Sequence, residues 1–414
     1  MQALPRQFFP RALMSISAIA RPLLNAMMLL LLGATSGYAA EMVGMPGMSK
    51  KPRVELASSA VFSPDGYLLA VSKKGEHLML YRSNDEGLSW SPPVVINAQP
   101  EAISADGENR PKIAFAKDGG VLVSWTKPLA KPYTGEIRFA RSDDGIHFSA
   151  PITVHQDRAE ITHRFESMLV ANDGRVLLAW IDKRDAEVQR ANKGAYRGAA
   201  IYTATSTDGG RSFQPERKLA DHSCECCRIA AATDKDGAPL FMWRHVFEPN
   251  ERDHAIVRVK SDGSPETLQR ATFDRWKIDG CPHHGPSLAV DAEGVRHAVW
   301  FNQKDGEGRV FYGRLGRAPG ANTVAGQRLV GGPRAEHADL TVVGQRVLVV
   351  WKEFDGQRTR LFAELSDDGG QTFKARELAA SDGPSDQPRA LLRGDVFYAF
   401  WRSEREGMRV VRLD

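Results

Sequence analysis

The chain has 414 residues, of which 42% are hydrophobic and 26% charged, and its 55 basic residues nearly balance its 51 acidic ones. This composition is typical of a globular protein. Because no long basic run with interleaved aromatic residues occurs, nucleic acid is excluded as a partner. The 37 Gly and 23 Pro make the chain rich in turns, which favours β structure.

Residues 1–40 have the pattern of a secretory signal peptide. Arg6, Arg11 and Arg21 precede the apolar run of residues 22–34, and small residues follow it. The run is shorter than the roughly 18 residues that a membrane-spanning helix needs. We therefore predict a cleaved signal, export to the periplasm or the medium, and no membrane span in the mature protein.

Residues 41–52 are predicted to form a flexible linker with methionine at every third position, namely Met42, Met45 and Met48. Thioethers are soft ligands that bind Cu(I) without losing a proton, also in oxidising compartments. The spacing is similar to the methionine motifs of bacterial periplasmic copper-handling proteins. The alternative is that these residues are only the apolar remainder of the signal region.

Residues 53–414 repeat one pattern: an apolar run, a turn with Gly, and a second apolar run that ends in Trp. The pattern ends in turn at Trp125, Trp180, Trp243, Trp300, Trp351 and Trp401, and an earlier copy ends at Ser72. The interval of about 50–63 residues suits a propeller blade of four antiparallel strands, which buries both its faces only when blades pack around an axis.

These seven units predict one all-β domain, a single β-propeller of four-stranded antiparallel blades. Seven blades are favoured, with six as the alternative. The last unit reaches the end of the chain after three strands. We therefore expect residues 53–57 to supply the fourth strand of the last blade and close the ring.

A recurring turn carries a family resemblance. Residues 83–90, 206–213 and 366–373 match the Asp-box, S-x-D-x-G-x-[ST]-[FW], and residues 140–148 hold a degenerate copy. The Asp is expected to accept backbone N–H groups across a hairpin of the outer strands, while the Gly adopts positive φ. The chain thus resembles the sialidase superfamily of Asp-box, or BNR-repeat, propellers, as a non-standard member with CxCC and CPHH motifs.

Sialidases clamp a sugar carboxylate with arginines, so the resemblance implies an exo-α-sialidase-like glycoside hydrolase. Four arginines stand just before the first strand of their unit, at the expected channel mouth: Arg110, Arg164, Arg228 and Arg389. The alternative is that they pair with neighbouring acids. The family's Tyr, Glu and Asp have no motif match, although the blade-three loop holds Tyr196, Tyr202, Asp185 and Glu187.

The same positions hold most of the chain's sulfur and several histidines. Units four and five are neighbours, and their entrances carry the sequences CECC and CPHH. The candidate metal ligands are Cys224, Cys226, Cys227, Cys281, His283 and His284, with His222, His163 and His337 as outer or alternative ligands. Thiolate and imidazole together favour copper, zinc or an iron-sulfur centre over Mg²⁺ or Ca²⁺.

Exported cysteines also suit disulfides. Cys281 with one cysteine of CECC would join blades four and five, and a second bond would lie within CECC. A redox-active dithiol is a third alternative. On an extended strand Cys224 and Cys226 would share one side and Cys227 would face the other, so that three thiols would converge only at a bend.

These observations predict an exported propeller that binds a soft metal ion, copper before zinc, at its channel mouth. The second hypothesis is a sialidase-like exo-glycosidase that acts on acidic sugars. The third is a non-catalytic interaction propeller with structural disulfides, which meets a periplasmic protein partner.

Overall fold

The computed structural model describes residues 54–414, except 305, 318–319 and 321. The predicted signal peptide and the methionine linker lie outside the described residues. Among the described residues, no helix is long and apolar enough to cross a membrane.

The described residues form seven antiparallel sheets that follow one another along the chain. The first sheet contains β1 (Ser58–Phe62), β2 (Leu68–Lys74), β3 (His77–Ser83) and β4 (Val94–Val95), and the second contains β5 (Lys112–Phe115), β6 (Val121–Pro128), β7 (Gly135–Ser142) and β8 (Ile152–Thr153). The third sheet contains β9 (His163–Val170), β10 (Val176–Asp182), β11 (Ala199–Ser206) and β12 (Arg217–Ser223), and the fourth contains β13 (Ala230–Thr233), β14 (Pro239–Arg244), β15 (His254–Arg258) and β16 (Gln269–Arg270).

The fifth sheet contains β17 (Ser287–Val290), β18 (Arg296–Lys304), β19 (Glu307–Leu315) and β20 (Val324–Val330), and the sixth contains β21 (Ala335–Val343), β22 (Arg346–Phe354), β23 (Thr359–Ser366) and β24 (Lys374–Ser381). The seventh sheet contains β25 (Arg389–Arg393), β26 (Val396–Ser403) and β27 (Gly407–Leu413). The described part of the chain adds one helix, α1 (Arg184–Ala191), between β10 and β11.

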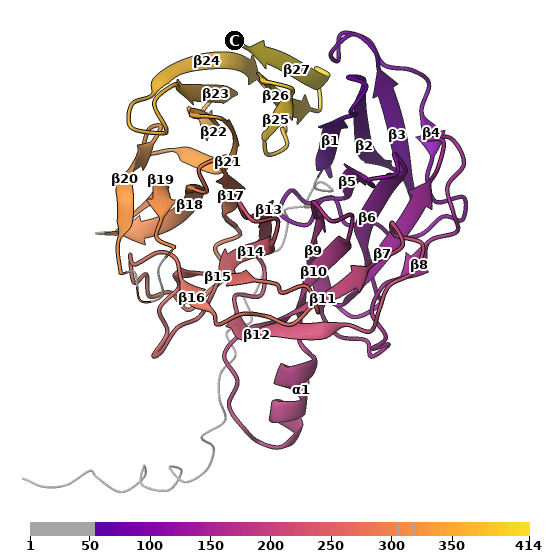
Figure 1. Ribbon diagram of the computed structural model, residues 1–414, viewed down its shortest axis with the longest axis vertical. Coiled ribbons are helices and arrows are strands. Elements are labelled where there is room, and N and C mark those ends of the chain that lie inside the picture. The colour runs from indigo at the N-terminus through magenta and orange to yellow at the C-terminus, as the bar shows by residue number, and fades with distance from the viewer. Residues whose placement is uncertain (1–53, 305, 318–319, 321) are drawn as a thin grey trace, which may run out of the picture. The chain divides into compact units, whose positions relative to one another are not determined.

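The seven sheets are blades arranged around a central axis (Figure 1). The first strand of each blade lies innermost and contacts the first strands of both neighbouring blades, so that β1, β5, β9, β13, β17, β21 and β25 form a closed ring. The structure confirms the all-β, seven-bladed propeller, and the six-bladed alternative is wrong.

The predicted extra strand at the ring closure is not confirmed. The seventh sheet has three strands in the described part of the chain, and residues 54–57 belong to no strand. Ala57 N–H instead donates to Ala105 O at 3.2 Å, so this segment is bonded to the loop ahead of blade two. Blades seven and one are joined by packing, with the ring centroids of Phe62 and Tyr398 4.7 Å apart, and by polar contacts such as that of Arg393 with Glu86.

The repeated tryptophans lie on the second strands of blades two to seven, and each is at most 2% exposed. Ser72 takes the same place on β2. Trp180, for example, packs with Leu122 and Phe139 of the preceding blade. A second strand meets neighbouring blades on both faces, which explains why the repeat places its largest side chain there.

The Asp-box hairpins join the third and fourth strands of their blades, as predicted. In blade six, Asp368 Oδ1 accepts the N–H of Thr372 and Ser366 Oγ accepts the N–H of Gly370, each at 2.9 Å. Gly370 has φ +78°, and a Cβ there would lie 1.7 Å from Tyr312 Oη of blade five. The box therefore fixes its hairpin against the preceding blade.

Candidate functional site

The CECC segment, residues 224–227, bends between β12 and β13. This bend places Cys224 Sγ 4.0 Å from the Sγ atoms of both Cys226 and Cys227. The alternation expected of an extended strand is therefore absent. The chain turns here because it passes from the outer strand of blade three to the inner strand of blade four, and the turn lets three thiols converge.

Cys281 reaches the same place from the loop ahead of β17. The Sγ atoms of Cys224, Cys226 and Cys281 all lie within 4.8 Å of one another, which is a group that can hold a metal ion. Cys281 is exposed, whereas the three cysteines of CECC are buried. The cluster thus extends from the core between blades three and four to the surface.

The cluster distributes its protons unequally. Hydrogen bonds from the thiols of Cys226 and Cys227 hold the pKa of Cys224 well below its ordinary value. Arg252 Nη1 donates to the same sulfur at 3.6 Å. The hydrogen bond with Cys224 raises the pKa of Cys226 and of Cys227, and it raises the pKa of Cys281 to about 11. A single thiolate is therefore stabilised at Cys224.

The spacing of the sulfur atoms suits a thiolate metal site. A metal–sulfur bond of about 2.3 Å separates the sulfurs of a trigonal site by about 4.0 Å and those of a tetrahedral site by about 3.8 Å. The sulfurs of Cys224 and Cys226 are 4.0 Å apart. This pair can bind an ion without moving, and Cys281 lies on the exposed side, where it can approach.

The four cysteines are unpaired in this structure. A disulfide needs sulfur atoms about 2.0 Å apart, whereas Cys224 is 4.0 Å from both of its neighbours in CECC. A disulfide of Cys224 with Cys226 or Cys227 would therefore require these sulfur atoms to move.

A second group of ligand atoms lies on the loop ahead of β17 in blade five and at the start of β21 in blade six. His284, Glu336 and His337 each offer one nitrogen or oxygen atom within 4.8 Å of the others. The ring of His284 stacks on Phe301 and on His337, with centroid distances of 4.1 and 4.3 Å. Burial lowers the pKa of His284 to about 2 and lowers the pKa of His337 as well. Both imidazoles are therefore neutral near pH 7.

The other predicted histidine ligands belong to neither group. His163 on β9 is fully buried and stacks on His155 with centroids 3.9 Å apart, as a core histidine does. His222 packs beside Tyr196, and His283 is exposed with φ +53°. The three methionines of the linker lie outside the described residues.

The four arginines at the mouth are paired with protein carboxylates. The pairs are Arg110 with Asp386 at 3.0 Å, Arg228 with Glu108 at 3.2 Å, Arg389 with Asp339 at 3.3 Å and Arg164 with Asp106 at 3.6 Å. Arg110 and Arg228 are almost completely buried. A ligand carboxylate would have to displace a protein carboxylate from these two, so they match the alternative of neighbouring ion pairs.

Glu108 bonds to residues of several blades at the channel mouth. Oε2 accepts the backbone N–H groups of Arg228 and Gly285, each at 2.9 Å, and Oε1 accepts Gln387 Nε2 at 3.0 Å. Burial by itself would raise the pKa of this carboxyl, but the Arg228 guanidinium and His337 hold it well below its ordinary value. One carboxylate thereby connects blades two, four, five, six and seven.

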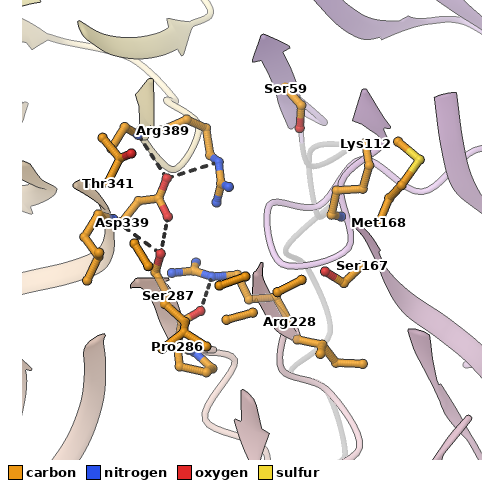
Figure 2. A pocket seen from close by; sticks show the side chains of 18 of the residues that line it. Ser59, Lys112, Ser167, Met168, Arg228, Pro286, Ser287, Asp339, Thr341 and Arg389 are labelled. Atoms are coloured by element: carbon orange, nitrogen blue, oxygen red, sulfur yellow. Dashed lines mark hydrogen bonds and ion pairs between the residues drawn. The ribbon is translucent and has the colours of Figure 1, made fainter. Parts of the chain in front are cut away.

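A cavity of about 510 Å³ follows the channel beside this network. Figure 2 shows Lys112 and Arg389 facing each other across it, with Asp339 held between Arg389 and Ser287. Lys112 Nζ lies 4.0 Å from Glu166 Oε1, a buried oxygen without a hydrogen-bond partner. Burial lowers the pKa of Lys112 to about 8.

The tyrosines in and near the blade-three loop are each bonded to an aspartate, and not to Glu187. Tyr202 donates to Asp185 at 2.9 Å and Tyr196 donates to Asp221 at 2.7 Å. Burial and these carboxylates raise the pKa of both phenols. Glu187 lies on α1, which has no buried residue.

Three acidic residues that the sequence also places at the entrances to inner strands are not among the predicted site residues: Glu108, Glu336 and Asp386. Each stands within three residues of a predicted site residue. Their position was the signal, but the residue types alone do not show which carboxylate meets which cation.

No protein-family model and no curated protein matches this chain. Among solved structures, an ulvan lyase of polysaccharide lyase family PL25 has a TM-score of 0.55 at 11% identity, covering 86% of this chain and 91% of that one. The same kind of lyase bound to -[GlcA(1-4)Rha3S]- gives 0.54 at 11% identity, with 87% and 95% covered. Polysaccharide lyase Uly1 gives 0.53 at 10% identity, with 89% and 91% covered. At such identities the similarity shows the fold alone.

Proposed function

We propose that this protein is an exported, periplasmic propeller that binds a soft metal ion, Cu(I) in preference to Zn²⁺, at a thiolate site on its channel mouth. One observation carries the proposal: Cys224, Cys226 and Cys281 converge from two blade connections, with their sulfur atoms within 4.8 Å of one another. Thiolates select soft ions over Mg²⁺ and Ca²⁺.

The number of ligands favours copper. Structural Zn²⁺ sites have four protein ligands, whereas the group contains three sulfur atoms. Cys227 is the one further thiol nearby, 4.0 Å from Cys224 and buried in the same core as Cys224 and Cys226. A four-coordinate structural zinc site would need Cys227 as its fourth ligand, and a three-coordinate copper site would not.

The remaining support comes from the sequence. The predicted signal peptide would place the chain in an oxidising compartment, where exposed thiols are at risk. Burial of the three CECC cysteines protects them from oxidants. Met42, Met45 and Met48 of the predicted linker would capture Cu(I) or pass it on, because thioethers bind it without deprotonation.

The test is a metal titration of the mature protein, reduced under anaerobic conditions. We expect one Cu(I) per chain, with sulfur neighbours in its X-ray absorption spectrum. Cys224→Ser is expected to lose the ion because Cys224 contacts both other CECC sulfurs. A reduced wild-type protein that binds neither Cu(I) nor Zn²⁺ would falsify the proposal.

Cys227→Ser is the matched control, since it makes the same change in the same buried loop. Retention of one Cu(I) by this variant supports the three-coordinate site. If the wild-type protein binds Zn²⁺ but not Cu(I), and Cys227→Ser abolishes this binding, the site is a four-thiolate zinc site instead.

A second candidate function is the sialidase-like binding of a small acidic sugar in the channel. It is favoured by Lys112 and Arg389, two cationic side chains that face the cavity of about 510 Å³. Arg389 is the least buried arginine of the three that line this cavity, with 31% of its side chain exposed. A guanidinium in this position can bind a carboxylate.

Calorimetric titration with sialic acid and with glucuronic acid tests this candidate, together with assays on fluorogenic glycosides of both. We expect Arg389→Met to weaken binding, whereas Arg405→Met, at an exposed ion pair of the same blade, should leave it unchanged. Absence of binding and of sugar release in the wild-type protein contradicts this function, and if the metal titration is negative as well, the interaction propeller remains.

A further inference from the structure

We propose a second and separate cation site, formed by His284, Glu336 and His337, for a divalent ion that prefers nitrogen and oxygen ligands, such as Zn²⁺. It goes beyond the proposed thiolate site and does not depend on it, because no sulfur takes part. His284 comes from the loop ahead of β17, Glu336 and His337 lie at the start of β21 in the next blade, and their ligand atoms lie within 4.8 Å of one another.

His337 is oriented as a metal-binding histidine is. Its Nδ1 lies 3.3 Å from Glu108 Oε1 and 2.8 Å from Gln387 Nε2. Its Nε2 faces Glu336, 3.8 Å from Oε2. A histidine that binds a metal through one nitrogen usually donates the other N–H to a carboxylate, which fixes the ring. Glu108, which is itself held by Arg228, can be this acceptor once the Gln387 amide turns away, because Gln387 Nε2 is a donor and His337 Nδ1 accepts from it in this structure.

His284 brings a nitrogen that lacks a partner. Its Nδ1 is buried and makes no hydrogen bond, although buried polar atoms in proteins are nearly always bonded. Phe301 and His337 stack against the ring and hold it in place. If His284 only packs against its neighbours, this nitrogen has no hydrogen-bond partner, whereas a bound cation would supply the missing partner.

Glu336 supplies the negative charge of this group of ligands, and its carboxylate also lies close to a lysine. Lys352 Nζ lies 3.6 Å from Oε1, which leaves Oε2 directed at His337. The charge of Lys352 attracts the carboxylate and repels a cation that approaches it. Lys352 therefore lowers the affinity of the site, and its removal has the opposite effect from removal of Glu336.

The ligand set determines the class of ion. Two imidazoles and one carboxylate suit Zn²⁺ or Cu²⁺, whereas Mg²⁺ and Ca²⁺ require more oxygen ligands. Zinc bonds of about 2.0–2.1 Å place tetrahedral ligand atoms about 3.3 Å apart, so the group must contract on binding. The Glu336 side chain is 37% exposed and can move in, and the His284 ring must tilt out of its stack on His337 so that both nitrogen lone pairs point at one ion.

The experiment is a Zn²⁺ titration of the full mature protein, with the thiolate site first filled with Cu(I), and of the Cys281→Ser variant, which removes the exposed thiol. We expect one Zn²⁺ per chain, with a zinc K-edge spectrum that shows nitrogen or oxygen neighbours at about 2.0–2.1 Å and no sulfur at about 2.3 Å. Glu336→Gln should weaken Zn²⁺ binding by about tenfold or more.

Two further variants make the result specific. Lys352→Met should strengthen Zn²⁺ binding several-fold, which an effect on folding alone would not produce. His147→Asn is the matched control, because His147 is an exposed histidine beside a carboxylate, that of Asp144, and should leave binding unchanged. Circular dichroism shows whether each variant is folded.

The inference is overturned if Glu336→Gln and Lys352→Met leave the Zn²⁺ affinity unchanged, or if the zinc spectrum requires sulfur neighbours. Failure of the Cu(I) titration alone would contradict only the proposed thiolate site. The Zn²⁺ titration of the Cys281→Ser variant still tests the second site in that case, so the two failures are distinguishable.

Discussion

Arg110 and Asp386 form a two-point ion pair between blades two and seven, although they are 276 positions apart in the chain. Arg110 Nη1 donates to Oδ2 at 3.1 Å and Nη2 donates to Oδ1 at 3.0 Å. Both side chains are 2% exposed. The N–H of Ser58, which begins β1, also donates to Oδ2 at 2.9 Å. One buried carboxylate thus connects the first, second and last blades.

This ion pair is predicted to stabilise the ring. Asp386→Ala leaves the Arg110 guanidinium buried without its counter-ion, which should lower the free energy of unfolding by about 3–5 kcal/mol. Asp382→Ala is the control, since Asp382 forms exposed ion pairs with Arg358 and Arg405 and its loss should cost at most about 1 kcal/mol. Urea unfolding measures both, and equal losses would contradict the role of Asp386.

The Asp-box glycine of blade six is predicted to be irreplaceable, unlike its neighbour. Gly370→Ala forces a Cβ to within 1.7 Å of Tyr312 Oη at φ +78°, and strain plus overpacking should cost about 2–4 kcal/mol. Gly369 has φ +70° and no atom within 4 Å of the added Cβ, so Gly369→Ala should cost only about 1 kcal/mol. The two midpoints of thermal unfolding measure this difference, and equal midpoints would show that the inter-blade contact is unimportant.

Glu216 is predicted to make stability depend on pH in the acidic range. Burial alone would raise its pKa, but the N–H groups of Gln156 and Asp157 and the Arg184 guanidinium lower it to about 2. A carboxyl whose pKa is lower in the folded than in the unfolded chain stabilises the fold above the unfolded value of about 4.3. This stabilisation is lost as the pH falls towards 2.

Glu216→Gln should therefore reduce stability by about 2 kcal/mol at pH 7 and approach the wild-type value near pH 2. Urea unfolding at a series of pH values measures the convergence. Glu266→Gln, at a more exposed ion pair with Arg258, is the control and should change stability little at either pH. A constant difference between Glu216→Gln and wild type across this range would show that the carboxylate charge is not responsible.

The thiols are predicted to react in a defined order. Cys281 is exposed and the other three cysteines are buried, so iodoacetamide should label Cys281 first in the reduced native protein. Denaturation should make all four thiols reactive, and bound Cu(I) should protect Cys281. Mass spectrometry after digestion measures each site. A denatured, unreduced protein in which no thiol reacts contains disulfides, and the bend seen here is then rearranged.

The sequence alone predicts the architecture well because each blade is a local unit. The strands of a blade pair within one repeat, so the spacing of Trp180 and its counterparts reports the number of blades. The Asp-box likewise bonds within a few residues, as Ser366 does with Gly370. The ring closure is predicted less well, since the segment of residues 54–57 adds no strand to the last blade and its backbone N–H at Ala57 bonds to the loop at Ala105.

The repeat and the residue types by themselves determined an all-β ring of seven blades and placed sulfur, imidazole and guanidinium at its mouth. Only the tertiary structure decided how these groups are used. Glu108 meets Arg228 across 120 positions and Gln387 across 279, and such contacts depend on how the inner strands are set around the axis. The thiols of CECC converge because the chain bends there, which neither residue type nor spacing specifies.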